Sequence, residues 1–154
     1  MADLIFLYGP PGSGKSTLGR ALAQRLDLPF FDLDERIERD AGKPVAAIFA
    51  QNGEGDFRVR ETRALRALTR EAFEGVVALG GGALLDGGNR RLSQRHGRVV
   101  CLEAPLEVLL ARTARQPGRR PLLRDGKGTP AATHRLANLL GERAVHYSSF
   151  KRRL

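Results

Sequence analysis

The sequence predicts a three-layer α/β fold, in which helices cover both faces of a five-stranded parallel sheet. Short apolar runs alternate along the 154 residues with stretches whose apolar residues recur at helical spacing. The apolar runs are nearly continuous, which is typical of parallel strands buried on both faces. The length fits a single domain over residues 1–154 with a core of its own.

The N-terminal half alternates strands with helices. A strand is expected at residues 4–8, and a helix follows because Leu18, Ala21, Leu22 and Leu26 recur at helical spacing. The apolar run at 29–34 predicts a second strand that ends in carboxylates. Pro44 suits the first position of a short helix that ends before residues 52–53. A longer helix is expected from about 56 to 73, with one apolar stripe that includes Phe57.

The same alternation continues in the C-terminal half. Strands are expected at 76–79 and 98–102, and Pro105 is expected to open a helix that runs to about Arg112. Residues 113–130 are rich in Gly, Pro and charge and show no periodicity. The last helix carries Leu136, Leu139, Leu140, Arg143 and Tyr147 at helical spacing, and residues 150–154 are the candidate for a fifth strand.

The most specific motif lies between the first strand and the first helix. Residues 9–16, Gly-Pro-Pro-Gly-Ser-Gly-Lys-Ser, match the phosphate-binding P-loop in its proper context. Its glycines let backbone N–H groups surround anionic oxygens, and the helix N-terminus adds positive potential. Lys15 is placed to reach the terminal phosphates and Ser16 to ligate Mg²⁺. The sequence therefore predicts a nucleoside triphosphate site.

Asp32 and Asp34 come at the end of the second predicted strand. Residues two apart on an extended strand point the same way, so both carboxylates are expected to face one site. A nearby Mg²⁺ would make two close carboxylates tolerable, and one of them can accept a proton from an attacking hydroxyl. The alternative for Asp34 is a helix cap, because a natural helix start follows it.

Three further features are candidates for a ligand site. Arg58 and Glu61 lie three residues apart on the long helix. Their side chains either face partly into the protein or form an ion pair on its surface. Arg143 lies on the apolar stripe of the last helix, where a cation needs an anionic partner. The run Gly80, Gly81 and Gly82 follows a strand, and it is either a flexible turn or a place of close ligand approach.

The long segment 113–130 contains Arg119 and Arg120 followed by Pro121 and two leucines. An arginine with apolar neighbours suits a mobile lid that closes over substrates and excludes water. The alternative is a solvated basic loop.

Composition limits the function further. The formal net charge is +9, but the 22 arginines are spread along the chain without a nucleic-acid motif. Guanidinium groups suit phosphate and carboxylate, so we favour anionic small molecules over nucleic acid. The lone cysteine, Cys101, is expected to be a buried strand thiol. With no long apolar stretch, we expect no membrane partner and a cytoplasmic location.

Together these residues resemble the shikimate kinase family over almost the whole chain. The likeness is carried by six segments in register, which are residues 9–17, 31–34, 48–61, 79–82, 120–123 and 143–147. It implies a monomeric, three-layer P-loop kinase that uses ATP and Mg²⁺ to phosphorylate the 3-hydroxyl of shikimate in aromatic amino-acid biosynthesis.

The resemblance also implies a role for particular residues. Asp34 would bind the substrate hydroxyls and act as the base, while Asp32 and Ser16 would serve Mg²⁺. Arg58 and Arg143 would clamp the shikimate carboxylate. Gly80, Gly81 and Gly82 would lie beside that carboxylate, and Arg112 would lie against the adenine. Arg120 would contact the transferred phosphate and act as a catalytic group together with Lys15. The nucleotide phosphates would be surrounded by Gly12, Ser13, Gly14, Lys15, Ser16 and Thr17.

The chain departs from the family pattern after Tyr147, where relatives continue with a strand, a loop beside the adenine and a closing helix. Leu154 is the last residue here, so we expect weaker ATP affinity with shikimate binding largely kept. Other readings are a P-loop kinase for a sugar acid or a nucleoside monophosphate, and a non-catalytic nucleotide-binding regulatory module.

Overall fold

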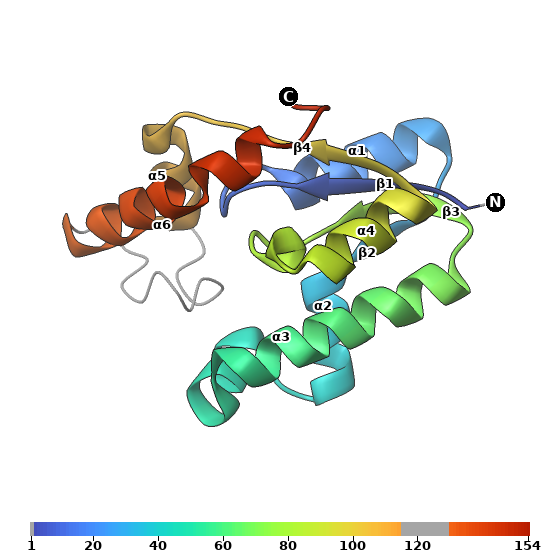
Figure 1. Cartoon of the computed structure of the whole chain (residues 1–154), viewed down its shortest axis with the longest axis horizontal. Helices are drawn as coiled ribbons and strands as arrows, with labels where there is room; N and C mark the ends of the chain where they lie inside the picture. The colour runs from blue at the N-terminus through green and yellow to red at the C-terminus, as the bar shows by residue number, and fades with distance from the viewer. Residues whose placement is uncertain (1, 115–129) are drawn as a thin grey trace.

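The computed structural model describes residues 2–114 and 130–154 (Figure 1). Its elements, in chain order, are β1 (Asp3–Tyr8), α1 (Lys15–Leu26), β2 (Phe30–Asp32), α2 (Leu33–Ala41), α3 (Val45–Glu71), β3 (Glu74–Ala78), the 3-10 helix η1 (Ala83–Leu85), α4 (Gly87–His96), β4 (Gly97–Cys101), α5 (Leu106–Ala114) and α6 (Pro130–Ser148). The described part confirms the predicted α/β class.

The sheet has the strand order β2-β3-β1-β4, and all of its strand pairs are parallel. Figure 1 shows α1 on one side of this sheet and α3 and α4 on the other, so the three-layer arrangement is confirmed. Because the strands are parallel, their carboxyl ends lie along one edge, where ligands bind in open α/β sheets. The P-loop, Asp32 and the triple glycine all follow strands at this edge.

The described sheet has four strands, where we predicted five. The segment after α6 does reach β4, since the Cys101 N–H donates to the Arg152 carbonyl at 2.9 Å and the Leu154 N–H donates to the Cys101 carbonyl at 2.9 Å. This pairing amounts to one parallel bridge, between Cys101 and Arg153. It is too short to form a fifth strand because α6 and its final turn occupy the chain up to Ser149.

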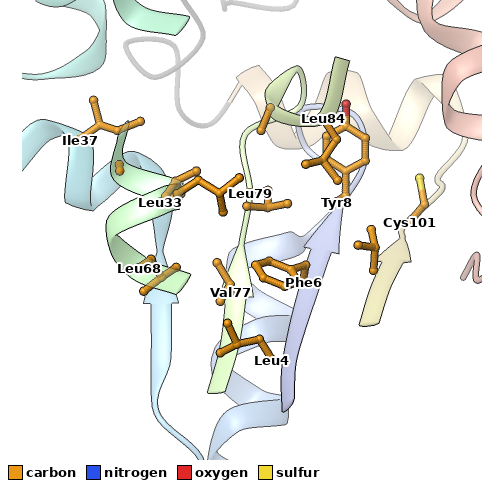
Figure 2. Close-up of a cluster of buried hydrophobic side chains, with 14 of the residues drawn as sticks. Leu4, Phe6, Tyr8, Leu33, Ile37, Leu68, Val77, Leu79, Leu84 and Cys101 are labelled. Carbon is orange, nitrogen blue, oxygen red and sulfur yellow. The ribbon is translucent and has the colours of Figure 1, made fainter. Parts of the chain in front are cut away.

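Strand β1 shows why the sheet needs a layer on each face. Leu4, Phe6 and Tyr8 point into the larger core (Figure 2), while Leu7 packs on the other face with Ala23 of α1. The larger core also takes Leu33 and Ile37 from α2, Leu68 from α3, Val77 and Leu79 from β3 and its extension, and Cys101 from β4. Cys101 is fully buried, as predicted.

Helix boundaries correct two of the predictions. Strand β2 ends at Asp32, and Asp34 lies in the first turn of α2, so the two carboxylates do not share an extended strand. Asp32, and not Asp34, is the helix cap, because its side chain accepts a hydrogen bond from the Glu35 N–H at 3.2 Å. The predicted break between two helices at residues 52–53 is confirmed, because Gly53 has non-helical φ and ψ of 83° and 172° and joins the two helical parts of α3 at a kink.

Helix α4 and η1 were not among the predicted elements. Two glycines open α4, but Asp86 caps it by accepting from the Asn89 N–H at 2.9 Å. The Asn89 side chain is buried and donates to the Ala83 carbonyl at 3.1 Å and to the Thr62 hydroxyl at 3.0 Å. These contacts stabilise a helix that local propensity disfavours. Of the helices in 2–114 and 130–154, none combines the length and apolarity needed to cross a membrane.

Candidate active site

The P-loop connects β1 to the N-terminus of α1. Gly12 and Gly14 have φ values of 80° and 93°, a left-handed conformation that residues with side chains rarely adopt. The Lys15 ammonium donates to the Gly9 carbonyl at 2.7 Å and to the Pro10 carbonyl at 2.9 Å, so it lies over the loop. Since α1 begins at Lys15, its positive end faces the same place. The arrangement suits a polyanion such as a nucleotide phosphate chain.

Ser16 and Asp32 lie together beside this loop. The Ser16 hydroxyl donates to Asp32 Oδ2 at 2.9 Å, although the residues are 16 positions apart. A hydroxyl and a carboxylate are the oxygen ligands that Mg²⁺ accepts alongside water and phosphate. These residues therefore fit the predicted Mg²⁺ site.

Asp34, Glu61 and the triple glycine meet at the end of β3. A Cβ atom built on Gly80 would lie 3.0 Å from Glu61 Oε2 and 3.3 Å from Asp34 Oδ1. The absence of a side chain at this position lets both carboxylates approach the backbone. Although Asp34 does not lie on strand β2, tertiary packing still brings it to the carboxyl edge of the sheet.

Arg58 and Glu61 form an ion pair that is buried on one side. Arg58 Nη1 lies 2.9 Å from Glu61 Oε1, and the Glu61 side chain is only 1% exposed. The alternative of a surface ion pair is therefore wrong. Burial raises the pKa of Glu61 to about 7, against the opposing effect of the Arg58 guanidinium, and nearby Asp34 adds to the rise.

Arg58 lies between Glu61 and the triple glycine. Burial lowers its pKa, but Glu61 and Glu54 outweigh this and raise the pKa overall, so the guanidinium stays charged. A Cβ on Gly82 would come within 2.6 Å of Arg58 Nη2, so the guanidinium lies directly against the triple glycine. The same run touches the P-loop, because a Cβ on Gly81 would lie 3.2 Å from the Gly9 carbonyl oxygen. The triple glycine therefore lies between the Arg58 guanidinium and the P-loop.

One cavity of about 930 Å³ joins these groups. The predicted site residues that line it are Gly12, Ser13, Gly14, Lys15, Ser16, Thr17, Asp32, Asp34, Arg58, Gly80, Gly81, Gly82, Arg112 and Arg143. Arg143 is 7% exposed, a buried cation that interacts electrostatically with Glu61. The structure therefore brings together every predicted site residue that lies in its described part.

The predicted lid falls mostly outside the described residues. Its flanks are helical, since Thr113 belongs to α5 and Pro130 begins α6. Arg120, predicted to contact the transferred phosphate, lies outside the described residues, so its role stays a prediction. Arg112 Nη1 donates to the Gly12 carbonyl at 3.1 Å, which places this guanidinium at the mouth of the P-loop.

Two lining residues had no predicted role in the site. Phe49 and Phe57 have ring centroids 4.8 Å apart, and both line the cavity near Arg58. Phe57 was expected only as a member of an apolar stripe. Phe49 precedes the kink at Gly53, and only the fold back across that kink brings the two rings together. A cavity with an apolar wall beside an arginine suits a small ring that carries a carboxylate.

A P-loop at the carboxyl edge of a parallel sheet, joined in one cavity to carboxylates and arginines, is typical of the P-loop kinase class. The comparisons with known proteins then specify the family. The family model described as shikimate kinase matches residues 11–154. The chain therefore belongs to the shikimate kinase family.

Individual relatives agree with this assignment. The shikimate kinase of Salinibacter ruber is 49% identical over 125 residues, which cover 81% of this chain and 61% of that protein. The shikimate kinase of Francisella philomiragia is 43% identical over 145 residues, covering 94% of this chain and 80% of the relative. The structure of the shikimate kinase from Acinetobacter baumannii in complex with shikimate has a TM-score of 0.89 at 38% identity, covering 100% of this chain and 83% of that one.

Proposed function

We propose that this chain transfers the γ-phosphoryl group of ATP to the 3-hydroxyl of shikimate, giving shikimate 3-phosphate and ADP, a step in aromatic amino-acid biosynthesis. The observation that carries the proposal is the single cavity in which the P-loop faces Asp34, Arg58 and Arg143. Family membership and the shikimate bound to the Acinetobacter baumannii enzyme support the choice of acceptor.

On the donor side, the P-loop backbone of residues 12–17 and the Lys15 ammonium would hold the nucleotide phosphates. Ser16 and Asp32 would hold Mg²⁺, which when bound neutralises charge on the phosphate oxygens. Lys15 now donates to loop carbonyls, so we expect its side chain to turn toward the phosphates when ATP binds. Arg112 is proposed to lie against the adenine.

On the acceptor side, Arg58 and Arg143 would bind the carboxylate of shikimate, with the backbone of Gly80, Gly81 and Gly82 beside it. Guanidinium groups suit carboxylates because their N–H groups match the two oxygens. The carboxylate also compensates the buried charge of Arg143, which would otherwise be costly.

In the chemical step, the 3-hydroxyl oxygen forms a bond to the γ-phosphorus and the bond to the β,γ-bridging oxygen breaks, so that ADP leaves. Asp34 would orient the hydroxyl and accept its proton. Arg120 is proposed to approach the transferred phosphoryl group. Catalysis would then consist of positioning and charge stabilisation.

An acceptor screen tests the proposal. The protein is supplied with ATP and Mg²⁺ and with shikimate, gluconate or nucleoside monophosphates in turn, and ADP release is measured in a coupled assay. We expect shikimate alone to be phosphorylated. Faster turnover with gluconate or a nucleotide would reassign the acceptor, and ATP binding with no acceptor turned over would indicate a regulatory module.

Two variants test the assigned roles. Asp34→Asn should abolish turnover while ATP still binds, because the P-loop is untouched; near wild-type turnover would refute the role as base.

Arg58→Ala should raise KM for shikimate far more than KM for ATP, because it removes a carboxylate contact. An equal change in both constants would leave Arg58 with a structural role only.

A monomeric state and a cytoplasmic location are also part of the proposal. Light scattering behind a sizing column gives the mass of the protein in solution, and a value near the 16.8 kDa of the chain is expected.

A further inference from the structure

Tyr147 connects the last helix to the triple glycine at the centre of the cavity. Its hydroxyl donates to the Gly81 carbonyl at 2.8 Å, across 66 positions in the sequence. Tyr147 is 6% exposed, and its ring packs 5.6 Å from the Tyr8 ring between centroids. A hydroxyl on a ring held this firmly fixes the direction of the carbonyl that it binds.

The same hydroxyl also interacts with Arg143. Tyr147 follows Arg143 by four residues on α6, so the two side chains lie on the same helix face. Burial raises the pKa of Tyr147, while the positive charge of the nearby Arg143 guanidinium opposes that rise. The Tyr147 hydroxyl therefore binds a carbonyl on the loop after β3 and has a cation of α6 as its electrostatic neighbour.

The orientation of the Gly81 carbonyl has a consequence for the next residue. In a planar trans peptide the C=O and the following N–H point in opposite directions. With the Gly81 carbonyl held toward Tyr147, the Gly82 N–H points away from it. Gly82 lies against the Arg58 guanidinium and lines the cavity.

We propose that Tyr147 is a positioning residue of the acceptor pocket: its hydroxyl holds the Gly81–Gly82 peptide in a single arrangement, next to Arg143, before the acceptor binds. Tyr147 is not among the described residues that line the cavity, so it acts through the Gly81–Gly82 peptide and its neighbour Arg143. The inference rests on the proposed function, because it assigns these partners to the acceptor.

The test compares two variants that each remove one buried phenol hydroxyl from the same aromatic cluster. Tyr147→Phe keeps the packed ring and loses the bond to Gly81. Tyr8→Phe is the matched control, because Tyr8 is fully buried and its hydroxyl, within the described part of the chain, bonds His146 Nε2 at 2.8 Å and not the triple glycine. KM for shikimate, KM for ATP and kcat are measured for both variants and for the wild type.

We expect Tyr147→Phe to raise KM for shikimate about tenfold, the size of effect that loss of one buried hydrogen bond has on an equilibrium. KM for ATP should change less than twofold, and Tyr8→Phe should leave both constants at the wild-type value. Loss of folded protein would lower apparent kcat without changing either KM, so it cannot imitate this result.

Three results would overturn the proposal: an unchanged KM for shikimate in Tyr147→Phe, an equal rise in both constants, or the same rise in Tyr8→Phe. If the wild-type protein phosphorylates a different carboxylated acceptor, the proposed substrate is wrong. The same comparison, made with that acceptor, then tests Tyr147 separately.

Discussion

Replacing Glu61 by glutamine should remove most of the pH dependence that this residue gives to folding. Glu61 is 1% exposed, its Oε1 pairs with Arg58 at 2.9 Å, and its Oε2 has no hydrogen-bond partner among the described residues. Burial raises its pKa from the ordinary value of 4.5 to about 7. Between pH 4.5 and 7, the Glu61 carboxyl is therefore protonated to a greater extent in the native protein than in the unfolded chain.

The direction and size of the effect follow from this difference. Where the native state binds more protons than the unfolded state, stability falls as the pH rises. A rise in pKa from 4.5 to about 7 corresponds to roughly 3 kcal/mol. This contribution is present below pH 4.5, declines through the window and is lost above pH 7. Glutamine has no such titration, so Glu61→Gln should lack the decline.

Urea unfolding at pH 5, 6, 7 and 8 measures the free energy of unfolding for the wild type and the variant. The value for Glu61→Gln minus that for the wild type should increase by about 2–3 kcal/mol from pH 5 to pH 8. Glu54→Gln is the matched control, since Glu54 pairs with the same arginine at 3.3 Å but is 53% exposed. Parallel curves for the wild type and Glu61→Gln would refute the argument, as would an equal effect in the control.

Three further predictions concern single positions. Gly97→Ala should lower the free energy of unfolding in urea by about 2–3 kcal/mol, because its Cβ would overlap a backbone carbonyl of β1. Gly141→Ala, at a position in open space on α6, should raise that free energy by about 0.5–1 kcal/mol. Similar changes in both variants would contradict this expectation. Gly82→Ala should displace the Arg58 guanidinium and raise KM for shikimate but not for ATP; unchanged kinetics would show that the arginine adapts freely. Ser16→Ala should raise the Mg²⁺ concentration needed for half-maximal rate; an unchanged titration would remove Ser16 from the metal site.

Local patterns predicted much of the fold. The apolar runs of β1, β3 and β4 were identifiable because strands buried on both faces are nearly continuous in apolar residues. Helix α4 was missed because its first residues are glycines. It is stabilised by Asn89, whose partners at Thr62 and Ala83 come from other elements. Such contacts leave no periodic signal in the sequence.

The site divides in the same way. The P-loop was recognisable because phosphate binding there depends on backbone conformation over eight consecutive residues, and adjacent residues encode that conformation. The position of Asp34 was predicted at the correct edge of the sheet, but for the wrong local reason, since it belongs to α2 and not to a strand.

What spacing could not reveal is how deeply each charged side chain is buried, and next to what. Residues three apart on a helix, such as Arg58 and Glu61, are equally compatible with solvent and with a core. The fold buries Glu61 against Gly80 and raises its pKa, and it brings Tyr147 to the Gly81 carbonyl. Desolvation and hydrogen bonding depend on neighbours from distant segments. The P-loop can therefore be identified in the chain alone, while the proposed acceptor pocket exists only after α3, α6 and the loop after β3 have packed together.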